Sequence, residues 1–382
     1  MTIQLPETGL VFWPVGTGDS TTICVNKNTI IQVDLNNMKK SESEDDPHAQ
    51  ILEELIKILP KKDGKPFLSL FILTHPDEDH CRGFKDLLSK VLIGEIWHTP
   101  RVFREYKKDQ CEDAKSFRDE ATRRTKIMIS NKGNLVDGDR LRLVGFDELL
   151  KEEKYLGFPR SAFSIPGEIV SMINGINVFN NFEAFIQAPF KDDSAGERNE
   201  TSLAMQITIK NNAAEGKALL LGDLSYPTLR KIFDYPIGNV AWDVFLAPHH
   251  CSKLVMYKKN ENGEDELQQD ILDDIKKAAG DIGYIISSSD PIPRKNNTGD
   301  NPPHAKAKSR YEEIVPNDFL CTMEHPNEKN PEPIIFDLSS DNLTYVEPSG
   351  EKKTYTEKLG LAIASARGEH EPPTKSTGFG NE

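Results

Sequence analysis

Two histidines and two aspartates lie within six residues of one another, directly after the apolar run 68–73. These side chains are His75, Asp77, Asp79 and His80. Carboxylates crowded this closely repel one another, and removing them from water is costly unless a cation neutralises them. The spacing therefore favours a divalent-metal site at the end of a buried strand. The alternative is a polar turn in which Asp79 caps the helix that follows.

Two later apolar runs end in the same way. The run 218–221 leads to Asp223, and the run 244–247 leads to the doublet His249 and His250. Each pattern alone is weak, because Gly-Asp is a common turn and a histidine pair is common on surfaces. If the three strands belong to one sheet, their ends meet at one edge, where ligands of α/β sheets usually bind. Three runs with one kind of ending therefore predict a shared site.

The composition is that of a globular protein that can bury a large core. The chain has 382 residues, of which 28% are charged and 37% apolar. No apolar run approaches the ~20 residues of a membrane span, and the first ten residues lack the features of a secretory signal. The five scattered cysteines include no Cys-x-x-Cys pair, which indicates reduced thiols. We expect a cytoplasmic protein with no membrane partner.

The formal net charge is −14, from 47 basic and 61 acidic residues. An acidic surface argues against broad nonspecific binding of nucleic acid, which depends on neutralising phosphates. Metal ions and a local basic patch could still supply a positive field. Global charge therefore excludes neither nucleic acid nor a small nucleotide as the substrate.

The segment 101–126 is predicted to be helical and is basic in an otherwise acidic chain. It has nine lysines or arginines against six acids, with Phe103, Tyr106 and Phe117 interleaved. One interpretation is a lid or a contact to a phosphate backbone. The favoured alternative is an ordinary solvated amphipathic surface.

The pattern of apolar residues predicts a layered α/β protein in which strands and helices alternate. Strands are expected at 10–13, 21–25, 29–33, 68–73, 140–146, 182–187, 202–210, 218–221 and 284–289. Helices are expected at 48–59, 258–280 and 305–314. We expect one hydrolase domain over 1–346 with an insertion at about 147–181, followed by a polar tail over 347–382.

The order of these motifs resembles the metallo-β-lactamase fold superfamily, whose signature is His-x-His-x-Asp-His, then a later Asp and a later His. Asp77 in the second ligand position is similar to the branch typified by the hydrolase domain of the competence DNA-uptake protein ComEC. Further segments resembling that branch are 15–20 (VGTGDS), 31–34 (IQVD), 199–203 (NETSL), 221–224 (LGDL), 247–252 (APHHCS), 303–304 (PH) and 324–325 (EH). The resemblance implies a four-layer αββα sandwich with two mixed β-sheets flanked by helices.

The resemblance also implies a centre of two divalent metal ions. His75 and Asp77 would hold one ion. Asp79, His80 and one histidine of the doublet would hold the other, and Asp223 would bridge the two ions. His250 is favoured, because the superfamily ligand usually precedes the glycine position that Cys251 occupies here. His249 is the close alternative.

The chain departs from the pattern in three places: Cys251 replaces the usual glycine, a histidine is missing from the metal site, and the insertion at about 147–181 has no counterpart. No histidine follows Pro189, where many superfamily members have a further ligand for the first ion. A first site rich in carboxylates and short of an imidazole shifts the preference from Zn²⁺ toward Mn²⁺. Cys81 and Cys251 adjoin the candidate ligands, and we expect them to be small packing residues rather than ligands.

Two metal ions of this kind suit phosphodiester hydrolysis, because they activate a water and stabilise charge on a phosphoryl oxygen. Asp79 and His304 are the catalytic candidates, His304 as proton donor or phosphate contact, or alternatively as a residue that stabilises its loop. The candidate substrate contacts are Lys253, Ser287, Ser288 and Ser289. Asp19 and Asp34 are candidates for orienting the ligands, and a turn explains Asp19 equally well.

The leading hypothesis is a metal-dependent nuclease acting on single-stranded or end-exposed DNA in a bacterial cytoplasm. A related hypothesis is hydrolysis of a small or cyclic nucleotide. The contrasting class is a partner-dependent subunit of a multi-protein system, such as a defence system, with a weakened metal site. The insertion and the polar tail would then be its docking elements for a protein partner. Asp in the second ligand position disfavours a β-lactamase or a lactonase.

Overall fold

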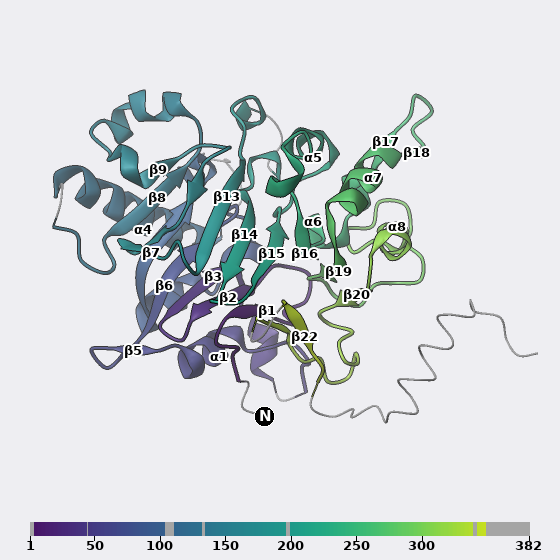
Figure 1. Ribbon diagram of the computed structural model, residues 1–382, viewed down its shortest axis with the longest axis horizontal. Coiled ribbons are helices and arrows are strands. Elements are labelled where there is room, and N and C mark those ends of the chain that lie inside the picture. The colour runs from purple at the N-terminus through teal and green to yellow at the C-terminus, as the bar shows by residue number, and fades with distance from the viewer. Residues whose placement is uncertain are drawn as a thin grey trace, which may run out of the picture. The chain divides into compact units, whose positions relative to one another are not determined.

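The computed structural model describes residues 4–43, 45–103, 111–131, 134–195, 199–338 and 342–348. Contacts along the chain group Met1–Val346 into one compact unit and Glu347–Glu382 into another. All but the first two residues of the predicted tail lie outside the described residues. The fold below is that of the first unit (Figure 1).

The first sheet contains ten strands within the described residues, in the order β22-β21-β1-β2-β3-β6-β7-β8-β9, with β5 beside β6. Neighbours from β22 to β3 are antiparallel, and those from β3 to β9 are parallel. The strands are β1 (Gly9–Phe12), β2 (Thr21–Asn26), β3 (Thr29–Val33), β5 (Lys61–Lys62), β6 (Lys65–Ile72), β7 (Leu92–His98), β8 (Arg140–Val144), β9 (Phe163–Ser164), β21 (Ile334–Asp337) and β22 (Thr344–Val346).

The second sheet has seven strands, again counted over the described ranges, in the order β10-β13-β14-β15-β16-β19-β20. The neighbours from β10 to β15 are antiparallel, and those from β15 to β20 are parallel. These strands are β10 (Ile169–Val170), β13 (Phe182–Ala188), β14 (Ala204–Lys210), β15 (Glu215–Leu220), β16 (Trp242–Leu246), β19 (Ala279–Ser287) and β20 (Asp318–Cys321). Both sheets are therefore mixed, as predicted.

Helices and small hairpins complete the unit. The helices are α1 (Ile51–Ile58), α2 (Glu78–Cys81), α3 (Phe84–Lys90), α4 (Glu112–Ser130), α5 (Tyr226–Ile232), α6 (Pro248–Cys251), α7 (Gln269–Ala278) and α8 (Ala305–Ile314). Short 3₁₀ helices cover Lys39–Glu42, Pro100–Phe103, Asp147–Lys151, Glu153–Tyr155, Arg160–Ala162, Asp192–Ala195, Asn199–Thr201, Ile237–Asn239 and Lys253–Val255. The remaining strands are β4 (Leu35–Asn36) and the hairpins β11 (Met172–Ile173) with β12 (Ile176–Asn177) and β17 (Tyr257–Lys259) with β18 (Asp265–Leu267). Among the helices of the described ranges, none combines the length and apolar character that crossing a bilayer requires.

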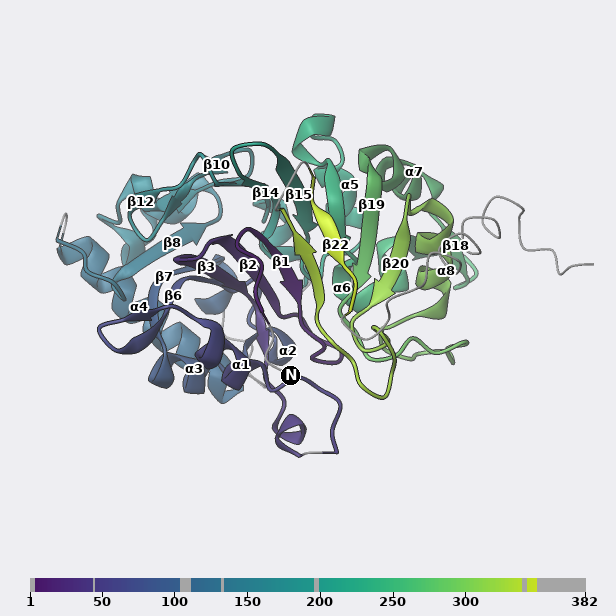
Figure 2. The same ribbon diagram turned by 60° about the horizontal axis from the view of Figure 1, so that its bottom comes forward.

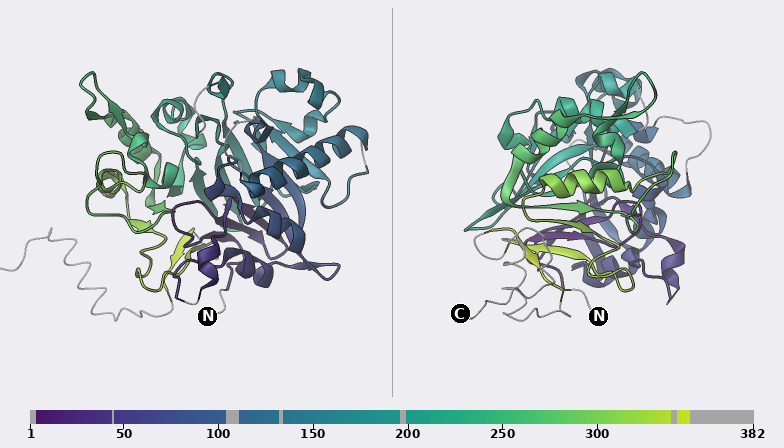
Figure 3. Two further views of the ribbon diagram at one scale, coloured as in Figure 1. Left: turned by 180° about the vertical axis from the view of Figure 1, so that it is seen from behind. Right: turned by 90° about the vertical axis from the view of Figure 1, so that its right-hand side faces the viewer.

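Three apolar clusters separate four layers, which confirms the predicted αββα architecture. The first lies between the first sheet and helices α1, α3 and α4, where the ring of Phe71 packs against Phe84 and Phe117. The second lies between the two sheets. The third lies between the second sheet and helices α5, α7 and α8. Figures 2 and 3 show the two groups of helices on the outer faces of the two sheets.

Strand β6 shows why apolar residues follow one another from Leu70 to Ile72, after Ser69. Leu68 and Phe71 point into the first cluster, while Leu70 and Ile72 point into the cluster between the sheets. A strand buried on both faces is apolar at most positions, so it loses the alternation of a half-exposed strand. The run that leads to the metal-ligand cluster is thus a central strand.

One predicted element differs in the structure, and one strand was not predicted. The segment 258–280 is a hairpin, β17 with β18, followed by the shorter helix α7, so the prediction of one long helix was wrong. Strand β7 was not predicted, although it lies next to β6 in the first sheet. The predicted insertion at 147–181 consists of short 3₁₀ helices and two-residue strands.

The basic segment 101–126 is only partly described, because residues 104–110, including Tyr106, lie outside the described ranges. Helix α4 begins at Glu112 and buries Phe117 against the first sheet. Its buried Arg124 forms an ion pair with Glu120 at 2.6 Å. The Arg124 guanidinium also donates to three backbone carbonyls at 3.0–3.2 Å, those of Ile93, Gly94 and Arg140. In this part of the segment, Phe117 and Arg124 therefore stabilise the packing of α4 against the first sheet.

We predict that Arg124→Met destabilises the protein by ~3 kcal/mol, because it leaves the Glu120 carboxylate and three carbonyls without a buried partner. Arg123 is the matched control, since it binds the same carboxylate from a side chain that is 46% exposed. Arg123→Met should cost ~1 kcal/mol or less. The free energy of unfolding in urea measures both. Equal effects of the two substitutions would contradict a structural role for Arg124.

Candidate metal centre

The three strand ends named in the sequence meet, but they come from two sheets. Strand β6, which precedes His75, belongs to the first sheet, and β15 and β16 are parallel neighbours in the second. The condition of one shared sheet is therefore not met, although the three strand ends do meet. The two sheets are joined at this point, because the Leu203 amide donates to the carbonyl of Thr74 at 2.9 Å. The centre lies where the ends of both sheets face each other.

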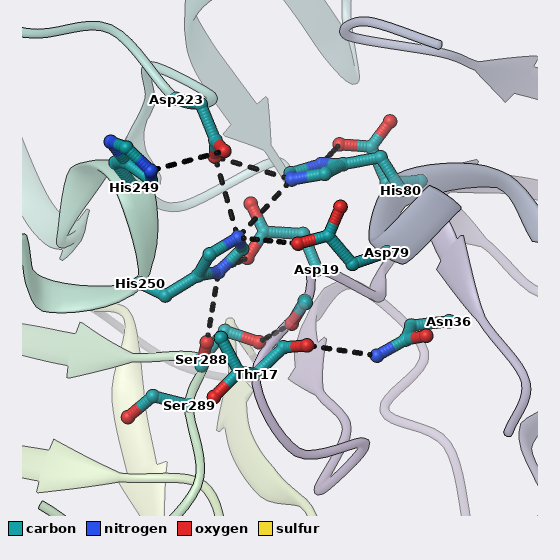
Figure 4. A network of polar contacts seen from close by, with 12 residues as sticks. Thr17, Asp19, Asn36, Asp79, His80, Asp223, His249, His250, Ser288 and Ser289 are labelled. Atoms are coloured by element: carbon teal, nitrogen blue, oxygen red, sulfur yellow. Dashed lines mark hydrogen bonds and ion pairs between the residues drawn. The ribbon is translucent and has the colours of Figure 1, made fainter. Parts of the chain in front are cut away.

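Asp223 lies in the middle of the group, and its two oxygens face different partners. Oδ1 is 3.2 Å from Nε2 of His80 and 3.5 Å from Nε2 of His250. Oδ2 is 3.5 Å from Nε2 of His75 and 3.8 Å from Nε2 of His249. Figure 4 shows Asp223 between His249 on one side and His80 and His250 on the other. The carboxylate thus separates two sets of imidazoles.

The Oδ1 side has the dimensions of a compact metal site. Nε2 of His80 and Nε2 of His250 are 3.3 Å apart, and Asp79 Oδ2 is 3.4 Å from Nε2 of His250. Ligands at the corners of a tetrahedron around zinc, at about 2.0–2.1 Å, are about 3.3–3.4 Å from one another. Asp19, His80, Asp223 and His250 also offer ligand atoms that all lie within 4.8 Å of one another. The spacing of these donors therefore fits a divalent cation.

The Oδ2 side is looser. Nε2 of His75 is 3.8 Å from Asp77 Oδ2, in addition to its 3.5 Å separation from Asp223. His249 lies on this side, where the sequence pattern lacks an imidazole after Pro189. The two imidazoles of the doublet therefore lie at different positions around Asp223. The two histidines face opposite oxygens of Asp223.

An unusual backbone conformation makes this division possible. His249, His250 and Cys251 all have left-handed backbone conformations, with φ of 51°, 52° and 65°. Each such residue costs roughly 1–2 kcal/mol when it is not glycine. The His249 amide donates to the carbonyl of Gly222 at 3.0 Å, which ties this turn to the one that carries Asp223. A strained turn held in place by its neighbours is typical of functional sites.

Asp34 contacts the His80 ring at the nitrogen opposite the one that faces Asp223. Its carboxylate accepts from Nδ1 of His80 at 2.8 Å, and from the Thr74 hydroxyl at 2.6 Å and amide at 2.8 Å. Asp34 is fully buried and has φ of 54°. Burial raises the pKa of its carboxyl group, and the nearby His80 partly offsets that effect. A carboxylate behind a ligand histidine fixes its tautomer and directs Nε2 at the metal.

The other imidazoles are fixed in a similar way. The Thr74 hydroxyl donates to Asp34, so it can accept from Nδ1 of His75 at 3.1 Å. Nδ1 of His250 donates to the carbonyl of Ser288 at 3.1 Å. With Nδ1 as the donor, Nε2 of each ring presents its lone pair to Asp223. Lone pairs that converge on a carboxylate repel one another unless positive charge lies between them.

The polar atoms and pKa values agree with that reasoning. His75 Nε2 and Asp223 Oδ1 are buried and have no hydrogen-bond partner among the described residues. Burial alone would lower the pKa of His80 and His250, but nearby carboxylates outweigh it and raise both well above the usual value. Burial would likewise raise the pKa of Asp223, but the histidines lower it strongly. Without a cation, the carboxylates favour the protonated forms of His80 and His250, which supply the positive charge. The donor set therefore fits a metal ion.

Asp79 and Asp19 approach the centre from the first sheet. Burial opposes ionisation of Asp79, but the contacts to His250 and His80 lower its pKa overall. The Asp19 amide donates to the carbonyl of Asp79 at 3.2 Å, and Asp19 Oδ1 is 3.4 Å from Nδ1 of His250. Asp19 was predicted only as an orienting residue, and its place among the donors makes it a further candidate ligand.

The remaining predicted residues are bonded within the fold. The Ser287 and Ser289 hydroxyls are buried and lie 2.8 Å apart, and the Ser288 hydroxyl donates to the carbonyl of Gly18 at 2.6 Å. His304 Nδ1 accepts from the Lys253 amide at 3.2 Å, and its Nε2 donates to the carbonyl of Asp300 at 3.1 Å.

The bonds of His304 and the burial of two cysteines each bear on a prediction. With both ring nitrogens of His304 committed to backbone groups, the structure favours its loop-stabilising role over its catalytic one. Cys81 and Cys251 are buried in the apolar clusters, as expected of packing residues.

Sequence reasoning missed Thr74 and Asn36. Thr74 links Asp34, His75 and the second sheet. The Asn36 amide group donates to the carbonyls of Val15 and Thr17 at 3.0 and 3.2 Å and thereby holds the loop that precedes Asp19. Thr74 adjoins His75 in the sequence, so its position was the available signal. Asn36 gave none.

Comparisons with known proteins give weak likenesses. No protein-family model and no curated protein matches the chain. Among solved structures, the metallo-beta-lactamase fold protein YhfI from Bacillus subtilis is 11% identical over 86% of this chain and 99% of its own, with a TM-score of 0.37. Igni18, a metallo hydrolase from the archaeon Ignicoccus hospitalis, is 10% identical over 86% of this chain and 100% of its own, with a TM-score of 0.39. MEM-A1, a subclass B3 metallo-beta-lactamase from a soil metagenome, is 12% identical over 64% of this chain and 78% of its own, with a TM-score of 0.30.

We predict that Asp34→Asn weakens metal binding by about 10–100-fold, because an amide holds the His80 ring less well than a carboxylate does. Asparagine tolerates the left-handed backbone of this position, so the fold should survive. Asp243→Asn is the matched control, since Asp243 is a partly buried carboxylate that accepts from the Lys217 amide at 2.8 Å. Competition with a chromogenic chelator measures the affinity. Equal affinities of the two variants would contradict the role of Asp34.

Proposed function

We propose that the chain is a metal-dependent hydrolase that cleaves phosphodiester bonds in DNA, at ends or in single strands. The observation that carries the proposal is the position of Asp223, with each oxygen facing its own set of imidazoles. A carboxylate that bridges two cations is suited to hydrolysis, because two adjacent cations hold both the attacking and the leaving oxygen.

Two sets of residues would hold the ions, with Asp223 common to both. The first set is His75, Asp77 and His249, and the second is Asp79, His80 and His250. His249 restores an imidazole to the first set, so both sets combine imidazole with carboxylate, which suits Zn²⁺ or Mn²⁺. The argument for Mn²⁺ from a missing imidazole is correspondingly weaker.

When bound, the ions would supply a water of lowered pKa and positive charge for a developing phosphoryl oxyanion. The chain's own residues position this chemistry. Asp34 holds the His80 ring, and the carbonyl of Ser288 holds the His250 ring. Burial of these groups excludes bulk water, so the ligands keep their geometry with little reorganisation.

A group of three lysines, one of them close in the sequence to the doublet, supports an anionic substrate. Lys253 lies two residues after Cys251, and its Nζ is 2.8 Å from Asp265 Oδ2. Lys259 and Lys306 bind the same carboxylate at 2.7 and 3.3 Å. Three cations on one carboxylate leave an excess of positive charge, which attracts phosphates despite the acidic chain. The resemblance to the DNA-uptake branch favours DNA, and a small or cyclic nucleotide is the second candidate.

The direct test is digestion of linear, circular and single-stranded DNA with added Mn²⁺ or Zn²⁺, beside cyclic dinucleotides and a β-lactam. We expect metal-dependent cleavage of DNA that Asp79→Ala and His80→Ala abolish and Asp243→Asn retains. Cleavage that persists in both alanine variants would reject the assigned centre. Cleavage of the cyclic dinucleotides alone would favour the second candidate. A protein that binds no metal would favour the partner-dependent subunit.

Metal content tests the division of the doublet. We predict that the protein binds about two equivalents of divalent cation, and that His249→Ala and His250→Ala each reduce this to about one, because each removes a ligand from one side of Asp223. Elemental analysis after dialysis measures the content. Two equivalents retained in His249→Ala would show that His250 alone serves the centre.

A further inference from the structure

Two cysteines from distant parts of the sequence lie in contact beside the metal centre. The sulfurs of Cys81 and Cys111 are 3.7 Å apart, although the residues are 30 positions apart in the chain. A disulfide has an S–S length of about 2.0 Å, so the pair is within about 2 Å of bonding distance. Both are free thiols in this structure.

The two thiols differ in accessibility. Cys81 is fully buried, whereas Cys111 is partly exposed at the start of helix α4, where its sulfur accepts from the Ala114 amide at 3.4 Å. The hydrogen bond from Cys81 and the helix amide together lower the pKa of Cys111 to about 7, against the effect of burial. A partly exposed thiolate at a helix start is the usual setting of a reactive cysteine.

The other three cysteines lack these features. All of them are buried. Burial raises the pKa of Cys24 to about 12 and that of Cys321 to about 11, and it raises the pKa of Cys251 strongly. These thiols are protonated at neutral pH and closed to oxidants, so Cys111 is the reactive thiol among the five.

Cys81 connects the pair to the metal centre. It directly follows His80 on the short helix α2, and an isolated bridge pairs it with Leu35, the residue after Asp34. Asp34 and His80 are thus the residues just before Leu35 and Cys81, the two residues that this bridge pairs. Their contact therefore lies close to the Cys81 thiol. Movement of Cys81 toward Cys111 would shift His80 against the carboxylate that orients it.

We propose that Cys111 and Cys81 are a peroxide-sensitive pair that forms a disulfide and thereby lowers the metal affinity of the adjacent centre. The substrate of this second site is a hydroperoxide, with Cys111 as the attacking and Cys81 as the resolving thiol.

The steps balance without a further reagent. The Cys111 thiolate attacks one oxygen of hydrogen peroxide, the O–O bond breaks, hydroxide leaves, and Cys111 becomes a sulfenic acid. The Cys81 sulfur then attacks the Cys111 sulfur, the S–O bond breaks, and water leaves with the Cys81 proton. In sum, two thiols and one peroxide give one disulfide and two waters.

The linkage must work in both directions. If the disulfide weakens metal binding, bound metal must oppose disulfide formation by the same factor at equilibrium. We expect the oxidised protein to bind metal about 10–100-fold more weakly, the range that follows when a residue supporting a ligand is disturbed. This second effect rests on the proposed metal centre, whereas formation of the disulfide does not.

The test treats the full-length protein with hydrogen peroxide, with and without prior loading with Zn²⁺. We expect a loss of about 2 Da and of two titratable thiols. Tryptic digestion should join the peptide that ends at Arg82 to the peptide 109–115. In a glutathione redox buffer, prior loading with Zn²⁺ should lower the fraction of the disulfide at equilibrium. Chelator competition on the oxidised protein should show the weaker affinity, and a reductant should restore it.

Three variants keep the test decisive. Cys81→Ser should stop at the sulfenic acid, which a 1,3-dicarbonyl reagent traps at Cys111, and Cys111→Ser should not react. Cys321→Ser is the matched control and should behave as the unmodified chain. Sulfenic acid without a disulfide in the unmodified chain, or a disulfide through another cysteine, would overturn the proposal. A Cys81–Cys111 disulfide with unchanged metal affinity would overturn the link to the centre but leave the metal site intact.

Discussion

Asp223 is buried between imidazoles, and much of the local structure keeps its carboxylate in that position. The residue before it, Gly222, has φ of 53°, and a Cβ there would lie 2.9 Å from the Cβ of Ser202. Only glycine fits this turn. The Asp223 amide donates to the Ser202 hydroxyl, and the His249 amide donates to the Gly222 carbonyl. One crowded turn thus sets the position of the shared carboxylate and of the doublet together. The energetic cost of gathering these polar groups in a buried place is what a cation would offset.

The centre depends on the packing of the two sheets against each other. Its ligands come from both, so the apolar cluster between the sheets determines how far apart they lie. Polar contacts reinforce that packing close to the site. The Ser288 hydroxyl binds the carbonyl of Gly18, and the Thr17 hydroxyl donates to Asp290 at 3.0 Å. A loop from the first sheet is thereby held to the end of β19. The relative positions of the ligands at the site therefore depend on how the two sheets pack against each other.

The sequence allowed the layered fold and most of the ligand cluster to be predicted, because strand ends concentrate polar residues after apolar runs. It did not reveal which sheet each strand joins, since parallel pairing between distant segments leaves no local pattern. The opposite directions of His249 and His250 depend on a left-handed turn that such residues rarely adopt. Strand β7 contains Gly94 and Glu95, which conceal its apolar character, and the hairpin of β17 and β18 is too charged to be distinguished from a helix. Burial of side chains and pairing between strands determine where these strands form, and both exist only in the folded chain.

The position of β21 has a consequence for how the protein is made. This strand pairs with β1, which is otherwise paired only with β2, so the first strand of the chain lies beside one that begins at Ile334. During synthesis, one edge of β1 stays unpaired until the ribosome has added more than three hundred further residues. An unpaired edge is a template for aggregation, and long delays of this kind lengthen the exposure. The nascent chain therefore exposes this edge of β1 until β21 emerges.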